Sequence, residues 1–197
     1  MNSEYQLHIL IPLYNDWESL QILIQNIERI EYLKSYSIHI IIVDDGSLAD
    51  LVVYPKSTDL SIEILHLKTN VGHQRSIAIG LQYIADTQKN IGKIIVMDAD
   101  GEDKPQDIPC LLSACIENYN TKIIFAKRNK RYEGSFFRFS YFIYKFIFRA
   151  LTGFSINYGN FSCIPQKTVK MLIYQENIWN HFAGSIFQSK IAYKTIE

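Results

Sequence analysis

Residues 93–103 read KIIVMDADGED, and this stretch indicates the fold class. Its first five residues are mostly apolar and short in extent, which is typical of a buried strand. An acidic turn follows directly. A second run, IHIIIV at residues 38–43, likewise leads into a polar turn, DDGS at residues 44–47. Continuous Ile and Val runs of this kind predict a parallel sheet that is covered on both faces.

Strand and helix patterns alternate along most of the chain. Further strands are expected at residues 7–13, 61–67 and 122–126. Helices with one apolar face are expected at about 16–30, 73–87 and 107–118. Beyond residue 157 the patterns indicate a turn into a short strand, helices at about 166–174 and 179–190, and the start of another strand at 191–197. The alternation predicts an α/β fold with a mainly parallel central sheet flanked by helices.

Carboxylates follow the ends of several predicted strands. In parallel α/β sheets, ligands bind beyond the carboxyl ends of the strands. The acidic residues just after strand ends are Asp16, Asp44, Asp45, Asp98 and Asp100. We therefore expect them to converge on one rim of the sheet.

The composition excludes some functional classes. The 197 residues are 48% hydrophobic and 13% aromatic, which is too apolar for a disordered chain. Basic and acidic residues number 20 each, so the basic excess typical of a nucleic-acid binder is missing. The charges are unevenly divided, however, with a net −8 in residues 1–126 and +8 in residues 127–197. This division predicts a ligand-binding core followed by a segment that meets a different partner.

Basic and aromatic residues alternate in the stretch 127–149. It contains seven basic residues and nine aromatic residues but only one acidic residue, Glu133. Such a mixture suits a membrane interface, where rings lie at headgroup depth and cations meet anionic lipid. The alternative is that the rings form the core of a helical subdomain, and the recurring cations favour the interface.

The sequence also bears on cellular location. Cys110, Cys115 and Cys163 form no metal-binding spacing, and an odd count fits a reducing compartment. No secretory signal and no long uncharged apolar stretch are recognisable. We expect a cytoplasmic protein, peripheral on the inner face of a membrane.

The strongest local signal for chemistry is the acidic turn itself. Asp98, Asp100 and Glu102 place carboxylates at alternate positions, and their mutual repulsion favours a divalent cation. Oxygen ligands without His or Cys favour Mg²⁺ or Mn²⁺. A solvated acidic turn is the simpler alternative.

Three other groups could bind a ligand. Asp44 or Asp45 could accept hydrogen bonds from a base or a ribose, although capping of a helix is an alternative role. Gly72 would let the backbone approach a ligand, and Arg75 could pair with a diphosphate. Arg128, Arg131 and Arg138 are further candidates for phosphate contacts, unless they belong to a solvated basic face.

The order of these motifs resembles family 2 glycosyltransferases of the GT-A fold. The carrying segments are IPLYND at 11–16, VDDGS at 43–47, NVG at 70–72 and MDADGEDKP at 97–105. Arg128, the segment EGSFFR at 133–138 and GNF at 159–161 are similar to the polyprenyl-phosphate sugar transferases of the dolichyl-phosphate mannose synthase type. The resemblance implies a Rossmann-like GT-A domain with a C-terminal amphipathic helical segment, an acceptor and membrane interface formed by residues 127–197.

The resemblance also implies roles for individual residues. By this resemblance, the residues that bind the nucleoside are Pro12, Tyr14, Asp16 and Asp45. Asp44 and Ala99 belong to the same donor site. By the same resemblance, Asp98 and Asp100 bind the metal ion at the donor diphosphate, and Glu102 is a further ligand of that ion. Phosphate contacts fall to Arg128 and Arg138, which also stabilise the leaving group.

The implied activity is glycosyl transfer, of the hexosyltransferase type, from a UDP- or GDP-sugar to a polyprenyl phosphate by inverting displacement. A saccharide hydroxyl is the alternative acceptor and would need a base such as Glu102 or Asp103. Asn160 stands where the family usually has Asp, and neither the family's later basic segment nor the membrane helices of some members are recognisable. A shortened or degenerate protein that binds the donor without transfer therefore stays open, as does a homo-oligomer. A nucleotidyltransferase is disfavoured, because no Gly-rich phosphate loop follows the first strand.

Overall fold

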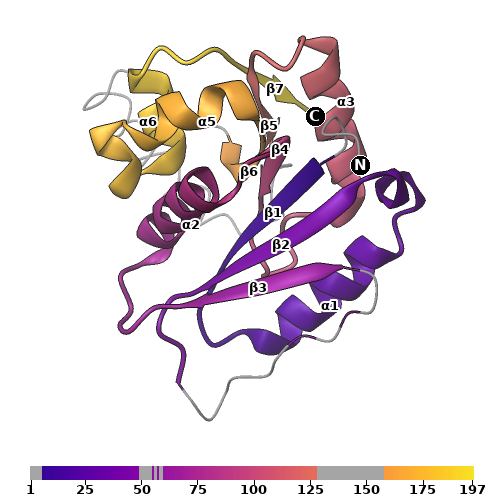
Figure 1. Ribbon diagram of the computed structural model, residues 1–197, viewed down its shortest axis with the longest axis vertical. Helices are drawn as coiled ribbons and strands as arrows, with labels where there is room; N and C mark the ends of the chain where they lie inside the picture. Colours follow the sequence, from indigo (N-terminus) through magenta and orange to yellow (C-terminus); the bar gives the residue numbers. More distant parts are fainter. Residues whose placement is uncertain (1–5, 49–54, 56, 58–59, 128–157) are drawn as a thin grey trace, which may run out of the picture.

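The computed structural model describes residues 6–48, 55, 57, 60–127 and 158–197. These residues form three layers, in which helices cover both faces of a central sheet (Figure 1). The sheet has seven strands in the order β3-β2-β1-β4-β6-β5-β7. The expected α/β class is therefore confirmed.

The strands of the sheet are formed largely by the apolar runs of the sequence. Their bounds are β1 Gln6–Leu13, β2 Ser37–Asp44, β3 Ser61–His66, β4 Lys93–Val96, β5 Ile123–Lys127, β6 Tyr158–Pro165 and β7 Tyr193–Ile196. Strands β3, β2, β1 and β4 pair in parallel, as do β5 and β7. Strand β6 lies between β4 and β5 and runs antiparallel to both. This antiparallel insertion is absent from the sequence expectation, because an apolar pattern does not specify the direction of a strand.

The helices begin and end close to the expected positions. Their bounds are α1 Trp17–Glu28, α2 His73–Thr87, α3 Ile108–Glu117, α5 Gln166–Ile173 and α6 Phe182–Gln188, with 3₁₀ turns η2 Glu31–Ser35, η4 Pro105–Asp107 and η5 Glu176–Trp179. The prediction of a helix at about 179–190 is wrong about where the helix begins, which is Phe182. A 3₁₀ turn precedes it, and His181 is extended and caps α6 by accepting a hydrogen bond from Gly184 N at 3.1 Å.

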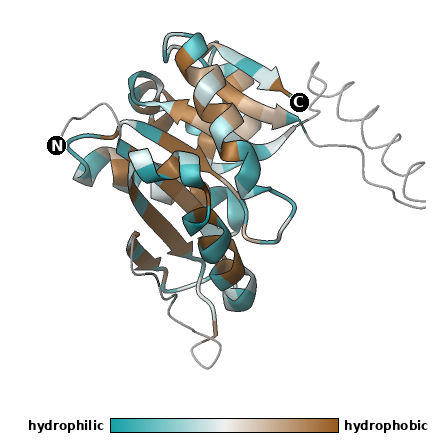
Figure 2. Cartoon of the chain, turned by 90° about the vertical axis from the view of Figure 1, so that its right-hand side faces the viewer, coloured by the Kyte–Doolittle hydropathy of each residue, from teal (hydrophilic) through white to brown (hydrophobic). Residues whose placement is uncertain are grey.

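Alternating side chains of the strands divide the core into two halves. In β1, Ile9 and Ile11 pack with α1 and α3, whereas Leu10 packs on the other face with α2, α5 and α6. Figure 2 shows the result as apolar strands enclosed by helices whose outer faces are polar. Two buried faces explain why the strands are continuously apolar rather than alternating.

Residues 128–157 lie outside the described part of the chain, and they include all but the first residue of the basic and aromatic stretch 127–149, with Arg128 and Arg138. None of the helices in the described part of the chain has the length and apolarity needed to cross a lipid bilayer.

Candidate functional site

A cavity opens beyond the carboxyl ends of β1 and β2, beside the first turn of α2. Its volume is about 230 Å³. It is lined by Pro12, Leu13, Tyr14, Asp45, Asn70, Gly72, His73 and Ser76. This is the edge of the sheet at which the sequence predicts a ligand.

The loop after β1 is fastened to the loop after β2 by reciprocal hydrogen bonds. Asn15 N donates to Ser47 Oγ at 2.8 Å, and Leu48 N donates to Asn15 Oδ1 at 2.9 Å. Asn15 has a left-handed backbone with φ of 62°, a conformation that Asn tolerates better than most residues. The exposed ring of Tyr14 at the cavity is thus carried on a braced loop.

Asp44 closes the loop after β2. Its Oδ1 accepts a hydrogen bond from Ser47 N at 3.0 Å, and its Oδ2 lies 2.7 Å from His66 Nδ1 at the end of β3. The side chain is buried. Both oxygens therefore have protein partners, and donor binding by Asp44 stays a prediction.

Asp45 holds the turn that precedes α2. Its Oδ1 accepts from Val71 N at 2.7 Å and its Oδ2 accepts from Gly72 N at 2.9 Å. The contact is close, because a Cβ on Gly46 would lie 2.8 Å from Asn70 N. A carboxylate can accept about four hydrogen bonds, so Asp45, which also lines the cavity, retains acceptor capacity.

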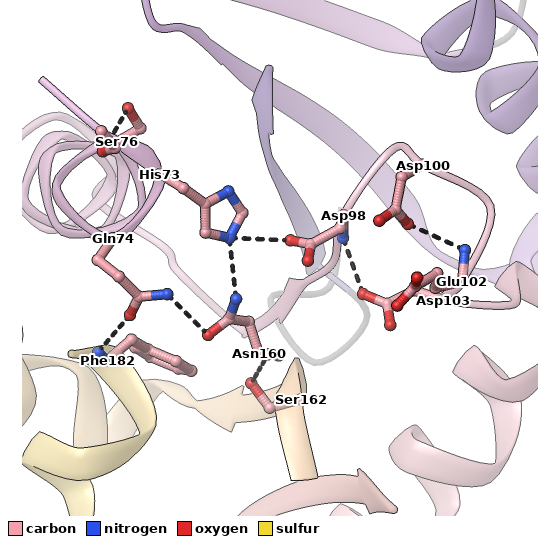
Figure 3. A network of polar contacts seen from close by, with 11 residues as sticks. His73, Gln74, Ser76, Asp98, Asp100, Glu102, Asp103, Asn160, Ser162 and Phe182 are labelled. Atoms are coloured by element: carbon pink, nitrogen blue, oxygen red, sulfur yellow. Dashed lines mark hydrogen bonds and ion pairs between the residues drawn. The ribbon is translucent and has the colours of Figure 1, made fainter. Parts of the chain in front are cut away.

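The acidic turn after β4 is organised by its own carboxylates. Asp98 N donates to Asp103 Oδ2 at 2.8 Å, and Glu102 N donates to Asp100 Oδ1 at 2.9 Å (Figure 3). Asp103 is buried, whereas Asp100 and Glu102 are exposed. Asp103, a candidate base in the sequence, thus has a structural role in closing the turn.

His73 joins this turn to the cavity. Its Nε2 lies 3.2 Å from Asp98 Oδ1 and 2.9 Å from Asn160 Nδ2 on β6. The polar contact with Asp98 raises the pKa of His73 above its usual value, against the opposing effect of burial, and the charges of Asp100 and Asp103 add to the rise. The sequence alone gave His73 no role at this site.

The residues present fit a divalent cation at Asp98. Its Oδ1 is buried and contacts His73 Nε2 at 3.2 Å without ordinary hydrogen-bond geometry, so a cationic ligand would offset the cost of burying this charge. Among the described residues, no three His, Cys, Asp or Glu side chains come together as a metal cluster. Mg²⁺ is usually held by only one or two carboxylates, with water and substrate phosphates completing its shell. The set Asp98, Asp100 and Glu102 stays a prediction.

The structure brings together only some of the predicted donor-binding residues. Those that line the cavity are Pro12, Tyr14, Asp45 and Gly72. Asp16 is exposed and caps α1, because its side chain accepts a hydrogen bond from Ser19 N at 3.3 Å. Asp is a common residue at this position of a helix. Arg75 is exposed on α2, and Ala99 is buried.

Sequence reasoning missed Leu13, Asn70, His73 and Ser76 as members of one cavity wall. Helical spacing was the available signal. In a helix that begins after Gly72, His73 and Ser76 are three residues apart and therefore share one face.

A cavity at the carboxyl edge of a parallel sheet, lined by Asp45 after β2 and close to Asp98 after β4, is typical of nucleotide-binding α/β proteins. Residues 8–172, more than half of the chain, match the glycosyl transferase family 2. The chain therefore belongs to this family, as its motifs predict.

Two curated relatives confirm the resemblance to polyprenyl-phosphate sugar transferases. The undecaprenyl-phosphate 4-deoxy-4-formamido-L-arabinose transferase of Yersinia enterocolitica serotype O:8 is 29% identical over 160 residues, which are 79% of this chain and 46% of that protein. The dodecaprenyl-phosphate galacturonate synthase of Rhizobium johnstonii is 27% identical over 138 residues, 68% of this chain and 39% of that protein. The chain thus spans less than half the length of either relative.

A solved structure shares the fold. It is the crystal structure of a Mycobacterium tuberculosis rv0371c homolog from Mycobacterium sp. strain JC1, with a TM-score of 0.57 and 10% identity. The match covers 100% of this chain and 86% of that chain. At this identity the likeness concerns the fold alone, which is the expected GT-A arrangement of a mainly parallel sheet between helices.

Proposed function

We propose that the protein is a glycosyltransferase that moves a sugar from a UDP- or GDP-sugar to a polyprenyl phosphate. The observation that carries the proposal is the cavity, lined by Asp45 and His73, beside the buried carboxylate oxygen of Asp98, which lies 3.2 Å from His73 Nε2. Membership of family 2 and the two polyprenyl-phosphate relatives support the reaction class.

The chemistry needs charge stabilisation on the leaving nucleoside diphosphate. Asp98 would hold Mg²⁺ or Mn²⁺, which when bound neutralises charge on the diphosphate. Asp45 would accept hydrogen bonds from the nucleoside through its remaining lone pairs. Pro12, near the end of β1, and Tyr14, in the loop after it, would line the same cavity. Arg128 and Arg138 are proposed to meet the phosphates.

A phosphate acceptor agrees with the residues at the site. A polyprenyl phosphate is already anionic at pH 7 and needs no strong general base. Asn160, an amide that contacts His73, stands where a family member usually has a carboxylate, and Asp103 accepts the hydrogen bond that closes its turn. A saccharide hydroxyl would need a base, which makes it the weaker candidate acceptor.

The basic and aromatic stretch 127–149 is proposed to dock the protein on the membrane that holds the acceptor. Vesicle co-sedimentation tests this step. The intact protein should bind anionic vesicles at low salt, and replacing Phe137, Phe142 and Phe146 with Ser should weaken binding. No co-sedimentation of the intact protein would refute the membrane role.

A thermal-shift panel of UDP- and GDP-sugars with Mn²⁺, repeated with EDTA, tests the donor site. A ligand at about 100 times its Kd stabilises a protein by about 2.7 kcal/mol, so a metal-dependent shift should be readily measured. The stabilising donor is then assayed for transfer to undecaprenyl phosphate. Metal-dependent donor binding without transfer would instead identify a binding protein, and no shift with any donor would overturn the proposal.

A further inference from the structure

Two of the three cysteines meet in the core, on the face of the sheet that α3 covers. Cys115 lies on the buried face of α3, and Cys163 lies on β6 between Ile95 of β4 and Ile124 of β5. Helix α3 packs against β5 and β6, and a hydrogen bond joins the two buried thiols. Both cysteines are free. The fold therefore places two reduced thiols, distant in the sequence, next to one another.

A buried lysine acts on the same two thiols. Lys93 is the first residue of β4, and because side chains alternate along a strand it shares the α3 face of the sheet with Ile95. Its side chain is only 9% exposed, and no carboxylate in the described part of the chain forms an ion pair with it. The positive charge of Lys93 lowers the pKa of both thiols.

Their surroundings nevertheless make the two thiols unequal. The hydrogen bond from Cys163 lowers the pKa of Cys115 against the opposing effect of burial, and the charge of Lys93 adds to the lowering. The same hydrogen bond and complete burial raise the pKa of Cys163. Since the thiolate is the reactive form of cysteine, Cys115 is the member of the pair that reacts first with an oxidant.

Cys115 is also the more accessible of the two, because it lies next to an exposed turn. It belongs to the last turn of α3, and Tyr119, just beyond the helix, is 85% exposed. Asn120 in the same turn accepts a hydrogen bond from Cys115 Sγ at 3.5 Å. Helix ends open locally more easily than the centre of a sheet. A small oxidant can therefore reach Cys115 by this route, whereas Cys163 lies on a strand with a neighbour on each side.

We propose that Cys115 and Cys163 are a peroxide-sensitive pair that closes to a disulfide between α3 and β6. The Cys115 thiolate attacks one oxygen of hydrogen peroxide, the O–O bond breaks and hydroxide leaves, which gives a sulfenic acid on Cys115. The sulfur of Cys163 then attacks the sulfenic sulfur, the S–O bond breaks, and the leaving hydroxide takes the thiol proton to become water. The two thiols lose two electrons, and one peroxide is reduced to two waters.

The disulfide links two elements that carry parts of the donor site. Helix α3 follows the acidic turn, and β6 carries Asn160, which contacts His73. A covalent link between them restricts the unfolded chain and so stabilises the fold. In a reducing compartment such a disulfide is transient, and a dithiol reverses it. The inference is independent of the proposed function, because neither donor nor metal takes part.

Mass spectrometry of the full chain tests the link in the Cys110→Ser variant, which lacks the exposed thiol. After treatment with hydrogen peroxide the folded protein should lose two hydrogens and regain them in dithiothreitol. Digestion should yield one linked pair of peptides, carrying Cys115 and Cys163. Adding Cys115→Ser should abolish the link. Absence of this link in the peroxide-treated, folded protein would overturn the proposal.

The unaltered chain in urea shows whether the fold directs the pairing. Cys110 is much nearer to Cys115 in sequence, and short loops close at a lower cost in entropy. Peroxide should therefore link Cys110 to Cys115 in the unfolded chain and Cys115 to Cys163 in the folded chain. The same Cys115–Cys163 link in both states would show that the fold does not select it.

Dimedone, which traps sulfenic acids, tests the order of the two steps. With Cys110→Ser and Cys163→Ser combined, Cys115 should be labelled strongly, whereas with Cys110→Ser and Cys115→Ser combined, Cys163 should be labelled weakly. Equal labelling would overturn the assigned order. Lys93→Met should slow the labelling of Cys115 about 2- to 5-fold, and Lys89→Met, the same change at an exposed site, should not. An unchanged rate in Lys93→Met would overturn the role of the lysine.

Thermal unfolding measures the effect of the link on the fold. The oxidised Cys110→Ser protein should unfold several degrees above its reduced form, whereas adding Cys163→Ser should remove the difference between peroxide-treated and reduced samples. An unchanged or lower unfolding temperature of the linked protein would overturn the stabilising role.

Discussion

The loops after β2 and β4 flank β1 and carry similar acidic sequences, yet their carboxylates are used differently. Both oxygens of Asp45 accept backbone hydrogen bonds from the turn before α2. Asp98 Oδ1 is buried and contacts His73 Nε2 at 3.2 Å. The first carboxylate organises the protein, whereas we propose that the second binds a ligand. Removing Asp45 should therefore damage the fold, and removing Asp98 should damage the chemistry.

The largest expected effect is on sugar transfer by Asp98→Asn. Loss of charge stabilisation at one site typically slows an enzyme by about 10²–10³-fold, or ~3–4 kcal/mol in the barrier. Thermal unfolding should change little, because Asn keeps the shape of the side chain and the lost attraction to His73 is offset by removing a largely buried charge. Asp107→Asn, the same change at an exposed carboxylate on the next turn, is the matched control. Full activity of Asp98→Asn would contradict the metal assignment.

Asp45→Ala should have the next largest effect, on stability. It leaves Val71 N and Gly72 N without their acceptor, and hydrogen bonds to a charged group contribute about 1.5–3 kcal/mol each. We expect the free energy of unfolding to fall by about 3 kcal/mol, measured by urea denaturation. Asp98→Ala should change it by less than about 1 kcal/mol. Equal losses in the two variants would remove the distinction between the loops.

Gly46→Ala tests how tightly the loop after β2 is pressed against the chain before α2. Its φ is 72°, and a Cβ would lie 2.8 Å from both Asn70 N and the Thr69 carbonyl carbon. We expect a loss of about 2–3 kcal/mol on urea denaturation, from backbone strain and the clash together. Gly101→Ala in the acidic turn has a similar φ of 81° but meets nothing within 4 Å, so it should cost only about 1–2 kcal/mol. A larger loss in Gly101→Ala would show that the loop after β4 is the more constrained.

Much of the sheet could be predicted from sequence because burial on both faces leaves continuous apolar runs. The runs at β1, β2 and β4 and the turns after them were recognisable in this way. Strand β6 was expected only as a short strand, since its direction depends on pairing with β4 and β5 rather than on its own pattern.

The site was harder to predict, because neighbouring residues of one type acquire different roles through distant partners. Asp44 and Asp45 are adjacent, but one contacts His66 on β3 and the other holds the turn before α2. Gln74 Nε2 donates to Asn160 Oδ1 although the residues are 86 positions apart, and no local spacing relates them. Such contacts depend on how α2 packs against β6 and α6.

The smallest expected effect concerns pH and compares His73, at the start of α2, with His8 on β1. The carboxylate of Asp98 raises the pKa of His73, whereas burial lowers the pKa of His8 on β1. A raised pKa contributes stability below the unfolded value of about 6.5, and that stability is lost as pH rises through the folded pKa. A lowered pKa has the opposite sign, so the contribution of His8 is lost as pH falls below about 6.5.

Asp98→Asn should therefore move the pKa of His73 down toward 6.5 and leave that of His8 unchanged. Unfolding curves should lose part of their pH dependence above 6.5 and keep the part below it. NMR titration of the ring C–H signals measures both groups in one sample, so His8 serves as the internal control. An unchanged pKa of His73 would mean that Asp98 does not act on the ring, and that the loop after β4 is as self-contained as the loop after β2.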